Sequence, residues 1–454
     1  MSSPPSLPIY LFTFNCARLL ITPSILATHL FSALDPSSPP PEIIAIGLQE
    51  FAPISYSFLG GDYLSPYLDQ WSSVPHLAAQ YFHSTNPNFP SEYVELGRYT
   101  VGMTALFIFG RRSERVKNLR FGAVGFGVWG MANKGAVAAR FGYSGGEEGD
   151  DDINVTIVAT HLSAHEHCCT DRNRDWETLS RGTVFETTVR TAPVINITSS
   201  EETPLLSENT TDSSSSPSIS GIYHPNTHLL VMGDLNYRTS HTSPTPEDFK
   251  HFPRRTEHFA EFFKRDQLTR ERIAGNTLHG LTEAPIDFPP TYKYLEDILS
   301  LLEDAEAGGS SGDRRQKSHE DIYDWSPNRW PSWCDRILWL PSNPGSEEQQ
   351  GSIKVHKYTS IPAIRFSDHK PVGLHISLPG IKSPKTVSSG DETDFRLNPP
   401  FPLDKDWKAK RYNAEVKEWI AGYAILMATT ANGLTFLGCV VLGAGVLWWG
   451  VAGR

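Results

Sequence analysis

Residues 228–238 read HLLVMGDLNYR, and within them an apolar run changes abruptly into a polar motif. The run from His228 to Met232 is bounded by turn residues, which predicts a short buried strand. Gly233 allows a close turn, so Asp234 and Asn236 leave the strand with their side chains on the same side. Such a carboxylate and amide can polarise a water molecule and hold its target. On its own, however, the motif is more typical of an ordinary turn.

The same pattern recurs along the chain, and this changes the interpretation. Each predicted strand at 9–14, 43–48, 154–160 and 228–232 ends in polar residues, and a further polar group precedes a strand near residue 372. These polar residues are Asn15, Gln49, Glu50, His161, Asp234, Asn236, Ser367, Asp368 and His369. Strand ends that meet at one edge of a sheet can direct their side chains into a common cleft. Oxygen-rich donors without a cysteine pair at zinc spacing favour a hard ion such as Mg²⁺.

Four stretches of the chain resemble a known family. They read GDLNYR at 233–238, PPTYKY at 289–294, WPSWCDRILW at 330–339 and SDHKPV at 367–372. Together they resemble the inositol polyphosphate 5-phosphatases, within the Mg²⁺-dependent endonuclease/exonuclease/phosphatase superfamily. Relatives in that superfamily share the first and last motifs but lack the Trp-Cys-Asp-Arg signature. The resemblance implies an α/β (α+β) fold, a four-layer αββα sandwich of two packed β-sheets flanked by helices, over residues 8–378.

The resemblance also implies catalytic roles for five residues. Asp234 matches the residue that activates the attacking water, and Asn236 matches the one that orients the water or the scissile phosphate. His369 and His161 match histidines that contact the transferred phosphate. Asp335 matches the carboxylate that fixes the tautomer of His369.

Metal binding is implied for three further residues. Glu50 matches the Mg²⁺ carboxylate, Asn15 lies beside it, and Asp368 is expected near the metal or in a neighbouring hydrogen bond. A buried glutamate at a strand end could instead pair with a cation. The resemblance implies no nucleophilic cysteine or serine. We therefore expect direct attack by water, with Mg²⁺ neutralising charge on the phosphate.

Substrate binding is expected from two motifs and two arginines. Lys134 follows Asn133 at a tight turn, where it can reach a phosphate, and the PPTYKY stretch meets the adjacent phosphate in the family. For the arginine after Asp335, a structural salt bridge is about equally well supported, and Arg238 is similarly ambiguous. The six candidates are Asn133, Lys134, Tyr292, Lys293, Arg336 and Arg238.

The C-terminal segment predicts a membrane anchor. From Trp419 to Gly450 the chain has 32 residues and no charge, more than the roughly 20 that cross a bilayer as a helix. Five basic residues precede it, which by the positive-inside rule places the catalytic domain in the cytosol. We expect one transmembrane helix, although Asn432–Gly433 leaves a helical hairpin open. We expect a tail-anchored protein, and the resemblance to a tail-anchored member of the family implies the endoplasmic reticulum as its membrane.

The expected organisation is one catalytic domain over 8–378, a linker with a basic flank over 379–417, and an anchor over 418–451. Insertions near 190–222 and 303–320 are Ser/Thr-rich or charged and predict disorder. Because every candidate site residue precedes Pro371, the tail should be dispensable for chemistry.

The expected function is Mg²⁺-dependent removal of the 5-phosphate of phosphatidylinositol 4,5-bisphosphate, or of other 5-phosphorylated inositol lipids and soluble inositol phosphates. The partners are then a phosphoinositide lipid and the membrane, with no obligate protein partner. A net charge of −11 and a pI near 5.8, without a basic stripe, argue against nucleic acid. A nuclease or sphingomyelinase type of phosphodiesterase and an inactive membrane scaffold are the alternatives.

Overall fold

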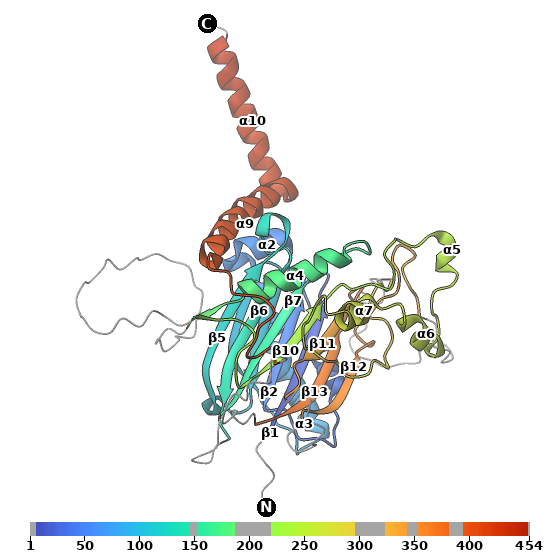
Figure 1. Ribbon diagram of the computed structural model, residues 1–454. Helices are drawn as coiled ribbons and strands as arrows, with labels where there is room; N and C mark the ends of the chain where they lie inside the picture. The colour runs from blue at the N-terminus through green and yellow to red at the C-terminus, as the bar shows by residue number, and fades with distance from the viewer. Residues whose placement is uncertain are drawn as a thin grey trace, which may run out of the picture.

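Two β-sheets packed face to face form the centre of the molecule, and helices cover their outer faces (Figure 1). The computed structural model describes residues 6–145, 152–186, 219–295, 323–342, 352–380 and 394–452. The expected sandwich of two sheets flanked by helices is confirmed.

The first sheet has six strands in the order β12-β13-β1-β2-β4-β3. Its only parallel pair is β1 with β2, and the other neighbours are antiparallel. The strands are β1 (Ser6–Asn15), β2 (Ile43–Gln49), β3 (Val94–Val101), β4 (Thr104–Gly110), β12 (Lys354–Ser360) and β13 (Val372–Pro379).

The second sheet has five strands in the order β11-β10-β7-β6-β5, with β10 and β7 parallel. A separate two-stranded ribbon pairs β8 with β9. The strands are β5 (Val116–Gly125), β6 (Gly135–Tyr143), β7 (Ile153–His161), β8 (Phe185–Glu186), β9 (Ile219–Ser220), β10 (Thr227–Asp234) and β11 (Asp335–Trp339).

Both faces of the central strands are buried, which explains their nearly continuous apolar sequences. In β1, Leu7, Ile9 and Leu11 enter the core between the sheets, while Tyr10 and Phe12 pack on the other side under helices. This division follows from the period of two along a strand. The first sheet is covered by α1 (Pro23–His29) and α3 (Ser65–Thr85), and the second by α4 (Cys169–Gly182) and α7 (Gln267–Ile273). Among the described residues, this part also contains α2 (Ile54–Leu59), α5 (Pro246–Phe249) and α6 (Phe259–Phe263).

The register of the strands brings the polar strand ends together. Asp234 is paired with His161 on one side and with Asp335 on the other, while Asn15 is paired with Gln49 in the opposite sheet. Because β1, β2, β7 and β10 all end at this edge, their terminal side chains share one end of the sandwich.

The C-terminal part differs from the expected tether and single anchor helix. Arg396 is buried and donates to the carbonyls of Thr227 and Leu340 (both 3.3 Å), so this part of the expected linker is packed on the domain. Then α9 (Trp407–Thr429) and α10 (Ala431–Ala452) follow, bent by 90° at Thr430, where the backbone is extended.

Within the described ranges, no single helix is long and apolar enough to cross a membrane. The pair formed by α9 and residues 431–444 of α10 meets the criteria of length and composition together. Gly433 permits the bend, because a side chain there would lie 2.4 Å from the Cα of Met427. Figure 1 shows α10 standing away from the sandwich.

The expected insertions lie largely outside the described residues, which exclude 187–218 and 296–322. Residues 219–222 are an exception, because β9 pairs with β8 and Ile222 is buried in the core. The end of the first expected insertion is therefore ordered.

Candidate active site

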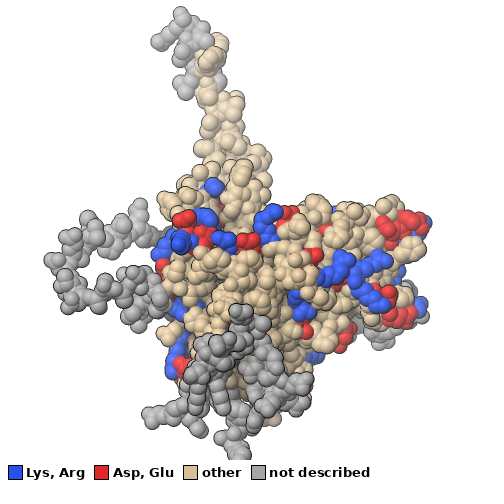
Figure 2. Space-filling view, in the orientation of Figure 1, with Lys and Arg blue, Asp and Glu red and all other residues tan. Residues whose placement is uncertain are grey.

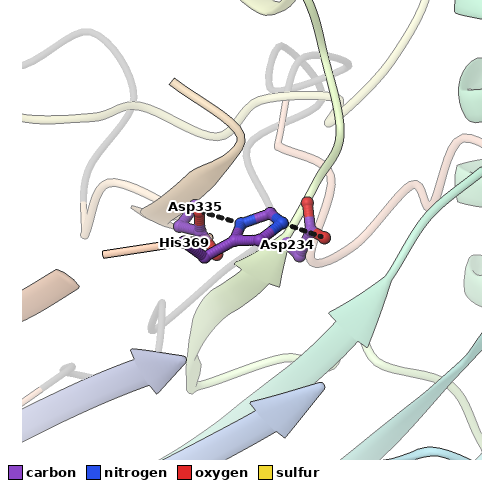
Figure 3. Close-up of side chains that lie close together, drawn as sticks. All are labelled: Asp234, Asp335 and His369. Carbon is purple, nitrogen blue, oxygen red and sulfur yellow. Dashed lines mark hydrogen bonds and ion pairs between the residues drawn. The ribbon is translucent and has the colours of Figure 1, made fainter. Parts of the chain in front are cut away.

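Asp234 lies at the centre of the converging strand ends, and it is 1% exposed. Its Oδ2 accepts a hydrogen bond from the side-chain amide of Asn15 (2.9 Å). The same oxygen lies 3.3 Å from Nε2 of His161. It also lies 3.8 Å from Nε2 of His369 (Figure 3). Burial opposes ionisation of Asp234, but His369, His161 and Lys134 outweigh it and hold its pKa well below the usual range. The carboxylate is therefore ionised at any physiological pH.

The turn after β10 requires glycine at its first position. Gly233 has φ of +154°, and a Cβ there would lie 1.9 Å from the carbonyl oxygen of Thr160. The Asn236 backbone N–H then donates to Asp234 Oδ1 (3.1 Å), and the Asn236 side-chain amide donates to the Leu162 carbonyl (3.1 Å). Asp234 and Asn236 are thus fixed relative to each other before any substrate binds.

His369 is held from its other side by Asp335, which is fully buried at the start of β11. Nδ1 of His369 donates to Asp335 Oδ2 (2.8 Å), as Figure 3 shows, and the Thr291 hydroxyl donates to the same oxygen (2.7 Å). Burial opposes protonation of His369, but Asp335 and Asp234 outweigh it and raise its pKa to about 9. His369 is thus an imidazolium at neutral pH, with Nε2–H directed toward Asp234.

Lys134 and His161 form the neighbouring wall of the site. The Lys134 ammonium contacts Nε2 of His161. Burial and the charge of Lys134 both lower the pKa of His161, so this histidine is neutral. Burial also lowers the pKa of Lys134, against the opposing effect of Asp234 and Glu50. A substrate phosphate would therefore meet a cation that has been partly removed from water.

Arg238 supports the site from behind. Its guanidinium contacts the side-chain oxygen of Asn236, its Nε donates to the Asn236 carbonyl (3.0 Å), and it stacks 4.3 Å from the centre of the Tyr292 ring. The Tyr292 ring in turn lies 4.5 Å from the ring of His369. Arg238 is 2% exposed, so it orients Asn236 and Tyr292 and does not face solvent.

Lys293 and Asp368 form an ion pair at the edge of the site. Lys293 Nζ donates to Asp368 Oδ2 (2.5 Å), and the two side chains are 29% and 14% exposed. Burial opposes ionisation of Asp368, yet His369 and Lys293 hold its pKa below the usual value. The sequence placed Asp368 either near the metal or in a neighbouring hydrogen bond. The structure shows the hydrogen bond, with Lys293 as the donor.

The residues at the open side of the cluster fit a hard metal ion. Glu50, one residue beyond β2, is 25% exposed and pairs with Arg18 (3.2 Å). Its charge opposes the lowering of the pKa of His161 and Lys134 that burial causes. Carboxylate and amide oxygens of Glu50, Asn15 and Asp234 suit Mg²⁺.

One group in the described part of the chain has ligand atoms within 4.8 Å of one another, and it comprises Asp234, Asp335 and His369. However, Asp335 Oδ2 already accepts from Thr291 and His369. Asp335 Oδ2 therefore orients His369, while Asp335 Oδ1 is buried and has no hydrogen-bond partner among the described residues.

Comparison with known proteins places this arrangement in a family. Residues 12–375 match endonuclease/exonuclease/phosphatase family 2. The chain belongs to this family.

Relatives on the inositol polyphosphate 5-phosphatase branch are recognisable by sequence. The mouse type II inositol 1,4,5-trisphosphate 5-phosphatase is 25% identical, over 73% of this chain and 26% of that protein. The phosphatidylinositol 4,5-bisphosphate 5-phosphatase INP51 of Saccharomyces cerevisiae is 26% identical, over 63% of this chain and 23% of its own length. The chain thus spans about a quarter of the length of these curated relatives.

A solved structure shares the fold. The inositol polyphosphate 5-phosphatase domain of spsynaptojanin, in complex with inositol (1,4)-bisphosphate and calcium ion, is 21% identical, with a TM-score of 0.55 over 94% of both chains. At this identity the likeness supports the fold alone.

Within this fold, Arg336 does not reach the cluster. It is 1% exposed, and it forms ion pairs with Asp266 (3.1 Å) and Glu283 (2.6 Å). The structural salt bridge, the alternative left open by the sequence, is the arrangement observed. Asn133 lies near the cluster on the same loop as Lys134, and its buried side-chain oxygen has no hydrogen-bond partner among the described residues.

Two residues inside the quoted motifs were given no role in the site by the sequence. Thr291 positions Asp335, and Ser367 donates to the Asn15 carbonyl (2.7 Å) while accepting from the His369 backbone N–H (3.1 Å). Their proximity to Tyr292 and His369 in the sequence was the available signal. Glu418, which accepts a hydrogen bond from the backbone of the Lys134 loop at Ala132, had no such signal because it lies in the C-terminal helix α9.

Proposed function

We propose that the protein removes the 5-phosphate of phosphatidylinositol 4,5-bisphosphate, in a Mg²⁺-dependent reaction at the cytosolic face of a membrane. One observation carries the proposal. The imidazolium of His369, held by Asp335, faces the ionised Asp234, whose partner Asn236 is fixed by the turn after Gly233. An anion that can align a water molecule, Asp234, therefore lies next to cations that can bind a phosphate, His369 and Lys134.

The chemistry follows from these charges. Asp234 accepts a hydrogen bond from the attacking water and aligns it, and Asn236 holds the water or a phosphate oxygen. A phosphoryl transition state is loose, so alignment matters more than base strength, which suits a carboxylate with a depressed pKa. His369 donates Nε2–H to a non-bridging oxygen, and Lys134 neutralises a second one. When bound, Mg²⁺ supplies charge neutralisation at the phosphate and at the leaving inositol oxygen.

The relatives support the position of the phosphate. The mouse and yeast proteins are named as 5-phosphatases. The structural relative binds inositol (1,4)-bisphosphate, which is what remains when the 5-phosphate leaves the 1,4,5-trisphosphate. We assign recognition of the remaining ring phosphates to Lys293 and Tyr292, at the edge of the cluster.

The membrane part of the proposal rests on α10 and its flank. Exposed apolar side chains cover α10, for example Phe436 (55%), Val441 (69%) and Leu442 (71%), with no protein partner among the described residues. We propose that this helix enters the bilayer, with the endoplasmic reticulum as the membrane. Alkaline carbonate extraction and fractionation of cells test both statements.

The experiment for the activity is release of inorganic phosphate from short-chain phosphatidylinositol 4,5-bisphosphate. We expect release with Mg²⁺ and its loss with EDTA, and no release from phosphatidylinositol 4-phosphate. Soluble inositol 1,4,5-trisphosphate serves as a second substrate to separate lipid from headgroup preference. Cleavage of single-stranded DNA or sphingomyelin, without release from either inositol substrate, would replace the proposal by a phosphodiesterase. An absence of all four activities would support the membrane scaffold.

A further inference from the structure

The helix that leads to α10 is packed against the catalytic domain. Gly422 of α9 lies against α2, where a side chain at this position would be 2.9 Å from Leu59. Because α2 begins four residues after Glu50, α9 braces the segment that follows the expected metal carboxylate. The same helix also reaches the loop between β5 and β6 that carries Asn133 and Lys134 (Figure 1).

Glu418 makes the contact with this loop. Its side chain is 4% exposed, although it begins the segment expected from the sequence to lie in the membrane. Oε1 of Glu418 accepts a hydrogen bond from the backbone N–H of Ala132 (2.8 Å), which is buried and lies two residues before Lys134. A buried carboxylate is retained only when it is paired and hydrogen-bonded.

Arg411 completes the contact from one α-helical face. Its Nη1 and Nη2 donate to Oε1 and Oε2 of Glu418 (2.9 and 3.2 Å), which makes a two-bonded pair. One residue earlier than Glu418, Lys417 donates to the carbonyl of Trp129 (3.1 Å), in the same loop. The loop is therefore held by α9 at two backbone positions.

The rest of the loop is tied to the sheets. Phe126 N–H donates to the Lys134 carbonyl (2.9 Å), and Met103 N–H donates to the Ala132 carbonyl (3.1 Å). These bonds join backbone groups to each other. The Ala132 N–H differs, because its acceptor is a side chain, that of Glu418. Its partner Glu418 is therefore one of the groups that hold the loop of Lys134.

We propose that Glu418 is a positioning residue of the active site: by holding the Ala132 amide, it sets the loop that presents Asn133 and Lys134 to the substrate phosphate. The helix α9 is then part of the catalytic domain and not a tether. This proposal departs from the expectation that the tail after about Asp406 is dispensable for chemistry. Only the kinetic test of this proposal depends on the proposed function, because it measures phosphate release.

The first test is kinetic and uses full-length protein in detergent with soluble inositol 1,4,5-trisphosphate, so that membrane binding plays no part. Glu418→Ala should raise KM by about tenfold or more, as expected for a lost charge-assisted contact to the substrate, with a smaller effect on kcat. Glu418→Gln keeps an acceptor for Ala132 and should restore most of the loss.

Glu415→Ala is the matched control, because Glu415 lies on the same helix and pairs with Arg411 (2.9 Å) but is 53% exposed and does not touch the loop. It should behave like wild type. If Glu418→Ala keeps wild-type KM and kcat, or if Glu415→Ala is equally impaired, the positioning role is refuted.

The second test does not depend on activity. Hydrogen exchange of peptides covering residues 126–135 should become faster in Glu418→Ala and in Arg411→Met, while peptides from β7 and β10 keep wild-type protection. Unchanged exchange in the loop refutes the proposal even if catalysis is altered. If wild type releases no phosphate, the proposed function fails, and the exchange experiment alone decides whether Glu418 positions the loop. If one of the two variants loses protection throughout the protein, it is unfolded, and the exchange of the loop in the other variant then decides.

Discussion

At the scale of single residues, the site is built around the carboxylate of Asp234, which has four contacts. Asp234 receives Asn15 and two histidines on Oδ2, and the Asn236 backbone on Oδ1. Each contact favours the ionised form, so burial does not neutralise the group. The neighbouring side chains are therefore held in fixed positions around a permanent negative charge. In the proposed reaction, this charge aligns the attacking water.

The first prediction concerns this charge. Asp234→Asn should lower kcat on short-chain phosphatidylinositol 4,5-bisphosphate by about 10²–10⁴-fold, because an amide cannot accept and align the water proton as a carboxylate does. KM should change little, since the phosphate-binding cations remain. Steady-state phosphate release measures both constants. A variant that keeps more than a tenth of wild-type kcat would contradict the role given to Asp234.

The second prediction concerns Lys293. Lys293→Ala should lower kcat/KM by about 10- to 100-fold on phosphatidylinositol 4,5-bisphosphate, the effect of losing a charge-assisted bond. The loss should be much smaller on phosphatidylinositol 5-phosphate, which lacks the 4-phosphate. Lys250→Ala, an exposed lysine paired with Glu247, is the control. Equal losses on both lipids would instead assign Lys293 to the support of Asp368.

At the scale of elements, the strand ends were predictable and the long-range pairs were not. Asn15, His161 and Asp234 each follow an apolar run directly, so local sequence identified them, and the strand register then brought them together. Arg336 was ambiguous because its partners Asp266 and Glu283 are 70 and 53 residues away. No local pattern encodes such a distance.

The C-terminal helix shows the same limit more strongly. The basic residues before the uncharged segment, most of which lie in α9, resemble a membrane flank, and the uncharged segment resembles one spanning helix. Both patterns are local, whereas the contact that decides the role of α9 joins Glu418 to Ala132 across 286 residues. The bend at Thr430 likewise depends on packing at Gly433.

The third prediction concerns the junction of the two sheets at the edge opposite the site. His228, at the start of β10, is 1% exposed, and its Nε2 donates to the Pro379 carbonyl of β13 (2.7 Å). Burial lowers its pKa to about 4. Because the folded pKa lies below the unfolded value of 6.5, the unfolded chain binds the extra proton. Stability from this group is therefore present above pH 6.5 and is lost as the pH falls toward 4.

Urea unfolding at pH 7 and pH 4.5 measures this effect. Wild type should lose about 2–3 kcal/mol more of its unfolding free energy between these pH values than His228→Gln, which keeps a donor but does not titrate. Identical losses in both proteins would mean that His228 is not the group responsible.

At the scale of the whole molecule, α9 and α10 join a catalytic end to an apolar rod. Figure 2 shows charged side chains over the sandwich and around the base of the helical arm, while the arm itself carries almost none. Because α9 is clamped to the loop of Lys134 and bends by 90° into α10, the direction of the active site relative to the arm is fixed. A protein anchored through α10 would thus present its site to the bilayer at a set angle.

The last prediction separates the two helices by comparing chains that end at Thr429 and at Asp406. The chain ending at Thr429 keeps α9 with Glu418 and Arg411, so its kcat/KM on soluble inositol 1,4,5-trisphosphate should stay close to that of the full-length chain. It lacks α10, so alkaline carbonate should release it from membranes that retain the full-length chain.

The chain ending at Asp406 also loses the partner of the Ala132 amide, and its kcat/KM should fall by about tenfold or more. Circular dichroism of both chains checks that the sandwich is folded. If the chain ending at Thr429 still pellets with membranes after carbonate treatment, membrane binding belongs to the domain with α9 and not to α10. Full activity of the chain ending at Asp406 would instead return α9 to the status of a tether, because the loop would then hold its position without Glu418.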